Sequence, residues 1–406
     1  MIPVPRFTVA LGTVPTHPIT QRYDLPVSPF VTGCITGAMV LLVALAWPGV
    51  RRPRTSPLPV VESWRNGLSP LVVIPRLLAV ALLVVAIIAG RVGADDDLEN
   101  IAPALVVGLA WPVLVLASVL LGPVWRWTDP WDSAARVLTR SHPGDGPGSV
   151  WPAAALALPW FWYLSAYQYP LAPRSVGLML AVYSLVTVAA CLAVGRVRWL
   201  STCEPLGIVL AWIALLPRGR LPDWEPPRGA EALLGVVAGG TLFAAVRRSE
   251  LWAAPNSAER ATLLATLGLL AFCAVGALAI WCLAIVAGSR STRPTVAQAV
   301  VPAVAGIVVA VAMDRNRLTT SLQLLPGLLG DPFGLGWDLL GRPGAGLNPA
   351  PLGASGLIAV QLAVATAGYL AGAIVLARSV RRGERAPVAV GLSLLCGASA
   401  IALATH

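Results

Sequence analysis

The chain contains few charged residues and no lysine. Charged residues make up 12% of its 406 residues and hydrophobic residues 57%, so that mean hydropathy is +0.75. This balance excludes a soluble domain, whose surface needs more polar groups. All 29 basic residues are arginines, and they do not interleave with aromatic residues on a polar segment. The pattern therefore also argues against nucleic-acid binding.

Histidine is almost absent, which limits the metal chemistry available to the chain. The three histidines, His17, His142 and His406, are far apart in the sequence, and the six cysteines lack metal-ligand spacing. A His-rich or Cys-rich metal site within one chain is therefore excluded, and no cofactor is expected. The only metal candidate is a weak one, in which His17 acts with Asp331 and Asp338.

Long apolar runs are abundant, and each is long enough to cross a hydrocarbon core of roughly 30 Å. Because only helices satisfy their backbone internally in lipid, the chain is predicted to be an all-α integral membrane protein with the lipid bilayer as its main partner. About ten transmembrane helices are expected: 31–48, 70–90, 101–122, 151–168, 175–195, 229–246, 260–287, 295–313, 353–377 and 386–404.

A further apolar run at 205–217 is too short to cross a bilayer unaided. If it does not cross, and if the N-terminus is outside, 18 arginines face the cytoplasm and 10 face out; if it crosses, the division is 15 to 13. The positive-inside rule thus favours a re-entrant or interfacial helix near 205–217. The expected organisation is an extracytoplasmic segment at 1–30 and one multi-pass domain at 31–404, in a bacterial cytoplasmic membrane.

Three loops carry an acidic residue followed by proline: Asp129-Pro130, Glu204-Pro205 and Asp331-Pro332. A carboxylate accepts hydrogen bonds at a helix N-cap, and proline suits the first helical turn. Each pair is therefore predicted to start a short helix. The alternative is that three broken helices direct their positive ends at a shared ligand, although the topology places the third pair on the other side of the membrane.

Arg76 and a group of tryptophans are predicted to lie at the membrane interfaces. Arg76 lies near the start of the span at 70–90, from which it can reach the headgroups by snorkelling. Three tryptophans in 122–131 are predicted to form an interfacial aromatic belt, with an aromatic cage for a cationic ligand as the alternative.

Short motifs along nearly the whole chain resemble the fenitrothion hydrolase-like family of bacterial integral membrane proteins. These motifs are Thr16–Pro18, Arg22–Val27, Asn100–Pro103, Gly122–Trp131, Gly195–Trp199 with Glu204, Gly240–Phe243 with Ser249–Trp252, Asp331–Gly341 and Gly368–Gly372. The resemblance implies a multi-pass membrane hydrolase with histidines and an aspartate on its late helices.

At those positions this chain departs from the family pattern. It has Phe243-Ala244-Ala245 where the resemblance implies aspartate, no histidine in 305–320, and Tyr369 where a histidine is implied. Alanine and tyrosine do not replace aspartate and histidine as ligands of a hydrolytic metal.

The leading functional prediction is therefore a non-catalytic structural or partner subunit, pairing with a catalytic membrane paralogue. One alternative is a passive channel or carrier for small apolar molecules, formed by the broken helices at 205–217 and 320–340. A second is a membrane hydrolase with a divergent site built from Glu204, Asp331 and Asp338.

Overall fold

The structure is a computed structural model of the 406-residue chain. It describes residues 28–46, 70–138, 148–249, 251–252, 257–287, 293–313, 317–340, 353–380 and 385–405, and these residues contain helices but no strands. Residues 1–27 of the segment predicted at 1–30, and all three histidines, lie outside the described residues.

The long helices match the predicted spans closely. They are α1 (Pro29–Ala46), α3 (Pro70–Val92), α4–η2–α5 (Ile101–Pro103, Ala104–Ala110, Trp111–Leu121), α8 (Trp151–Ser165), α9 (Pro173–Val194), α12 (Ala230–Val246), α13 (Ala258–Val286), α14 (Arg293–Ala312), α16 (Gly353–Ser379) and α17 (Ala386–Ala404). Among the described residues, eight helical segments are long and apolar enough to cross a membrane. The spans predicted at 151–168 and 229–246 correspond to α8 and α12, which are shorter, with 15 and 17 residues.

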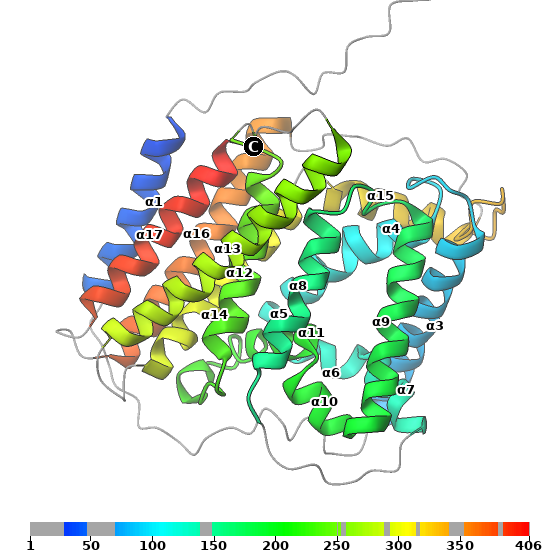
Figure 1. Ribbon diagram of the computed structural model, residues 1–406, viewed down its shortest axis with the longest axis horizontal. Helices are drawn as coiled ribbons and strands as arrows, with labels where there is room; N and C mark the ends of the chain where they lie inside the picture. Colours follow the sequence, from blue (N-terminus) through cyan, green and yellow to red (C-terminus); the bar gives the residue numbers. More distant parts are fainter. Residues whose placement is uncertain are drawn as a thin grey trace, which may run out of the picture.

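Several shorter helices lie at the ends of the bundle, with α6, α7 and α10 at the bottom and α15 at the top of Figure 1. They are α6 (Val124–Thr128), α7 (Pro130–Leu138), α10 (Arg196–Thr202), α11 (Pro205–Ile213), η3 (Leu221–Asp223) and α15 (Arg317–Gly330). We call the end with α6, α7 and α10 the lower end and the end with α4 and α15 the upper end, as they are drawn in Figure 1.

The third span contains a wide π-helical stretch, η2, for a local reason. Pro112 has no N–H group to donate to the carbonyl one turn earlier, and its ring crowds that turn. The π turns of Ala104–Ala110 directly before it absorb the mismatch.

The course of the chain shows that α11 does not extend from one end of the bundle to the other. The backbone N–H of Val150, just before α8, donates to Arg228 O, just before α12, at 2.9 Å. Past the other ends of these helices, the Arg247 side chain donates to Ser165 O. α8 and α12 therefore run parallel, and only α9 runs the full length between them. The segment from α10 to Arg228, which contains the short apolar run at 205–217, therefore starts and finishes at the lower end.

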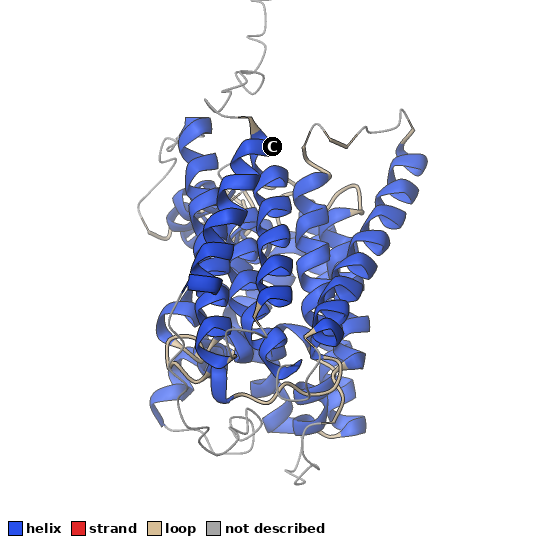
Figure 2. Cartoon of the chain, turned by 90° about the vertical axis from the view of Figure 1, so that its left-hand side faces the viewer, coloured by secondary structure: helices blue, strands red, loops and turns tan. Residues whose placement is uncertain are grey.

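Small residues allow the long helices to approach closely around a buried centre. α14 is the most enclosed of the long helices, because 94% of its most apolar 18-residue stretch is buried. A Cβ built at Gly239 of α12 would lie 2.3 Å from Phe272 O of α13, and one at Gly306 of α14 would lie 2.9 Å from the Gly368 Cα of α16. Glycine is required at these contacts because any side chain would push the helices apart. Figure 2 shows the resulting bundle of upright helices.

Candidate functional site

Two of the three acid–proline pairs begin helices at the lower end of the bundle. Glu204 caps α11, and its carboxylate accepts from Leu206 N at 3.0 Å and Gly207 N at 2.5 Å. Asp129 precedes α7, and its Oδ1 accepts from Trp131 N at 3.0 Å and Asp132 N at 2.9 Å. Both carboxylates are buried, with 2% and 1% exposed. Each acid thus satisfies the free N–H groups at the start of its own helix.

Aromatic side chains join these two helix starts. The Tyr183 hydroxyl, on α9, donates to Glu204 Oε1. The Trp131 ring lies 4.9 Å from the Tyr183 ring and 5.7 Å from the Trp125 ring. Trp125 and Trp131 are each only 7% exposed, whereas Trp127 is 38% exposed. The predicted interfacial belt is therefore wrong for Trp125 and Trp131, which are packed inside the protein.

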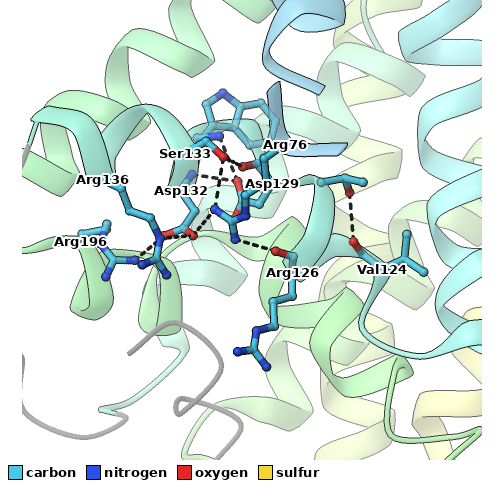
Figure 3. Close-up of polar contacts among 10 residues, drawn as sticks. Arg76, Val124, Arg126, Asp129, Asp132, Ser133, Arg136 and Arg196 are labelled. Atoms are coloured by element: carbon cyan, nitrogen blue, oxygen red, sulfur yellow. Dashed lines mark hydrogen bonds and ion pairs between the residues drawn. The ribbon is translucent and has the colours of Figure 1, made fainter. Parts of the chain in front are cut away.

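A buried ionic cluster lies beside Asp129 on α7 (Figure 3). Asp132 is fully buried and binds three arginines: Arg76 at 2.6 Å, Arg136 at 2.8 Å, and Arg196. Arg76 also donates to Arg126 O at 2.5 Å. The prediction that Arg76 snorkels to the headgroups is wrong, because its side chain is 3% exposed and tied to α6 and α7.

The environments shift the pKa values of these three acids in different directions. Burial, assisted by the charge of Asp132, raises the pKa of Asp129 well above its ordinary value. Burial also raises the pKa of Glu204, although the hydrogen bonds from Tyr183, Gly207 and Leu206 oppose that shift. Burial would raise the pKa of Asp132 as well, but the surrounding arginines prevail and lower it. The arginines therefore stabilise the anionic form of Asp132, whereas burial opposes the charged forms of Asp129 and Glu204.

The acid–proline helices belong to an internal structural repeat. In each copy a long helix ends at a glycine with positive φ, Gly122 at +92° or Gly195 at +97°. A short helix with an Arg-Trp pair follows, and then the acid–proline pair and a nine-residue helix, α7 or α11. The two copies pack against each other. The nine-residue helix of each copy contacts the long helix of the other, α7 with α9 and α11 with α5.

Above this repeat lies a cavity of about 480 Å³. Its floor is formed by Trp125, Pro130, Trp131, Tyr183 and Pro205 with its neighbours on α11. Its walls come from α3, η2, α5, α8, α9 and α12, and α15 borders it from the upper end. Among the described residues that line it, none has a charged side chain.

The third acid–proline pair does not begin a helix, contrary to the prediction. Asp331 follows the end of α15, and its carboxylate accepts from Leu335 N, Gly336 N and Trp337 N at 3.0, 2.6 and 2.9 Å. These N–H groups, with that of Phe333, outweigh the effect of burial and lower the pKa of Asp331. The carboxylate holds a turn in which Gly334 and Gly336 have φ values of +65° and +82°.

Glu204, Asp331 and Asp338 do not form the single site considered as one alternative. The turn that Asp331 holds contacts the upper end, where Ile101 N donates to Pro332 O at 3.2 Å. Glu204 lies at the lower end. A helix of about twenty residues that connects the two ends is about 30 Å long, so Glu204 is far from Asp331. Among the described residues no group of three metal-binding side chains occurs, and His17 lies outside them.

A second, smaller cavity is lined in part by residues of α12 and α14. This cavity of about 70 Å³ lies near the upper end and includes Ala244 of α12 and Val308 and Val311 of α14. Tyr369 is buried elsewhere and shares a hydrogen bond of 2.8 Å with Ser399. Arg248, Thr241 and Ser165 also line the smaller cavity, which is therefore partly polar.

Sequence reasoning missed Asp132, Tyr183 and the repeat itself. The repeat does leave a signal in the sequence, since Arg126-Trp127 and Arg198-Trp199 each stand between a glycine and an acid–proline pair. The glycine-to-acid distance is seven residues in one copy and nine in the other, which hides the match.

The fold and its apolar helices define a multi-pass helical membrane protein. No family model, curated protein or solved structure matches the chain.

Proposed function

We propose that this protein is a carrier for a small apolar molecule, which it binds in the 480 Å³ cavity. The observation that carries the proposal is the lining of that cavity, in which no described residue has a charged side chain. The cavity volume lies within the size range of small-molecule sites. Both broken segments on which the carrier alternative was based border this cavity, α11 through Leu206 and Val209 and α15 through Leu322 and Leu325.

The distribution of arginines supports an orientation with the lower end in the cytoplasm. Arg126, Arg136, Arg196 and Arg198 lie on the short helices of the lower end, and Arg228 lies at the start of α12. On the positive-inside rule this end faces the cytoplasm, and the start of α1 and the end of α17 face outward. The start of α1 lies beside the end of α17, because Gly33 packs against Ile401. Because the start of α1 and the end of α17 lie on the same side, the chain crosses the membrane an even number of times. This fits ten crossings of a bacterial cytoplasmic membrane, with α8 and α12 included.

The test is binding of the uncharged fluorophore N-phenyl-1-naphthylamine to the purified protein. Ala79→Phe places a ring in the cavity, since Ala79 lines it, and we expect at least a tenfold loss of affinity. Ala81→Phe is the matched control, because Ala81 is an exposed residue of α3 outside the cavity lining. Equal binding by the two variants would contradict the proposal.

A second candidate function is the non-catalytic partner subunit implied by the family resemblance. It rests on Ala244 of α12 and on the histidine-free segment 305–320, which line the smaller cavity and lack the aspartate and histidines that the resemblance implies. This candidate predicts co-purification with a histidine-bearing membrane paralogue from the native membrane. Isolation of the tagged protein alone, after mild extraction, would count against it.

A further inference from the structure

We infer that the occupant of the cavity is a hydrocarbon chain of a bilayer lipid, which enters sideways between α3, α5 and α15. The inference rests on the proposed binding function and names the ligand class and its route.

The cavity has a mouth on the outer surface of the bundle. Three residues that line it are also well exposed: Leu78 of α3 at 59%, Val113 of α5 at 42% and Leu322 of α15 at 50%. A residue that both lines a cavity and is exposed marks its opening. All three side chains are apolar, and the mouth continues into the exposed apolar surface of α3, which includes Leu77 and Val84. In a membrane, that surface faces lipid tails.

The cavity extends from this mouth to residues that lipid around the bundle does not reach. Phe161 of α8, Val209 of α11 and Val237 of α12 line it and are 5%, 2% and 2% exposed. The wall nearest the mouth includes η2, whose wide π turns contribute Leu105, Val106 and Leu109. A lipid tail can thus pass from the bilayer into the protein without crossing water.

The chemistry of the lining selects the chain rather than the headgroup. A phosphate or carboxylate brought into the cavity would be desolvated without a charged partner, which is costly. The carboxylates of Asp129 and Glu204 beneath the floor already accept backbone N–H groups of their own helices. The headgroup therefore stays at the membrane surface, and only an uncharged chain enters.

Photolabelling in lipid nanodiscs tests this route. The probe is a phosphatidylcholine with a diazirine in its acyl chain, and adducts are located by mass spectrometry. We expect adducts on interior residues such as Phe161 and Val209 in the wild-type protein. Val113→Trp narrows the mouth and should reduce interior adducts at least fivefold. Leu116→Trp is the matched control, since Leu116 is also on α5 and 42% exposed but does not line the cavity.

A second pair of variants guards against misfolding. Leu78→Trp should reduce interior adducts as Val113→Trp does. Leu77 is 64% exposed and does not line the cavity, so Leu77→Trp should give the same interior adducts as the wild-type protein. Adducts on exposed Val84 must persist in every variant and report an intact fold.

The possible outcomes separate the inference from the proposed function. Interior adducts that persist in both mouth variants would overturn the lateral route. If phosphatidylcholine gives no interior adducts while the free fluorophore still binds in the cavity, the lipid-chain inference is wrong and the carrier proposal stands. If neither probe reaches the cavity, both fail.

Discussion

Replacing Asp132 by asparagine should be one of the most destabilising single changes in the protein. Asp132 is completely buried and is the carboxylate shared by Arg76, Arg136 and Arg196. Arg76 and Arg196 are themselves 3% and 6% exposed, so water cannot replace the lost charge. Removing one partner from a buried ion pair typically costs about 3–5 kcal/mol. Because Arg136 is 19% exposed, it can turn towards solvent, so the loss of its ion pair adds little to this free-energy cost.

The assay is unfolding in mixed detergent micelles, followed by tryptophan fluorescence. The matched control is Asp95→Asn, which removes a carboxylate that lies 3.9 Å from Arg174 with both side chains about half exposed or more, at 65% and 47%. A pair of this kind contributes less than about 1 kcal/mol. If Asp132→Asn lowers the free energy of unfolding by no more than Asp95→Asn, the reasoning about the buried cluster is refuted.

Three further predictions concern the same helices and their packing. Because burial and the charge of Asp132 raise the pKa of Asp129 above its ordinary 3.8, its stabilising effect is present in full below about pH 4 and is lost as pH rises through the raised pKa. Asp129→Asn, which keeps the N-cap, should therefore flatten the fall in unfolding midpoint as the pH rises above about 4, and an unchanged slope would argue against this assignment. Gly122→Ala and Gly195→Ala should each lower the free energy of unfolding by about 1–3 kcal/mol, since both positions require positive φ; a neutral result at either would contradict the equivalence of the two repeats. Gly239→Val should reduce folded yield sharply because its side chain meets Phe272 O, whereas Gly327→Ala, with nothing within 4 Å, should leave the yield intact; similar yields would show that α12 and α13 pack less tightly.

The long helices could be predicted from the sequence because each carries its own signal. A run of about twenty apolar residues specifies a helix regardless of its neighbours, and the ranges for α1, α3, α9 and α14 agree with prediction within a few residues. The short length of 205–217, together with the arginine counts, led to the prediction that this segment does not cross the membrane.

The site could not be predicted in the same way, because it depends on contacts between distant segments. The partner of Arg76 lies 56 residues away on a helix that is not a span, so the sequence alone suggested snorkelling. Asp331-Pro332 looks like the other two acid–proline pairs, but Gly334 and Gly336 follow it and adopt positive φ, which ends regular structure. The cavity arises only when ten helical elements meet, and no local pattern encodes it.

The most direct test of the account is an experimental density map of the protein extracted from its native membrane into lipid nanodiscs. We predict elongated density that no protein atom explains, lying between α3 and α11 and reaching from Leu78 to Val209. A map in which side chains close this space, leaving no room for a ligand, would contradict the carrier proposal.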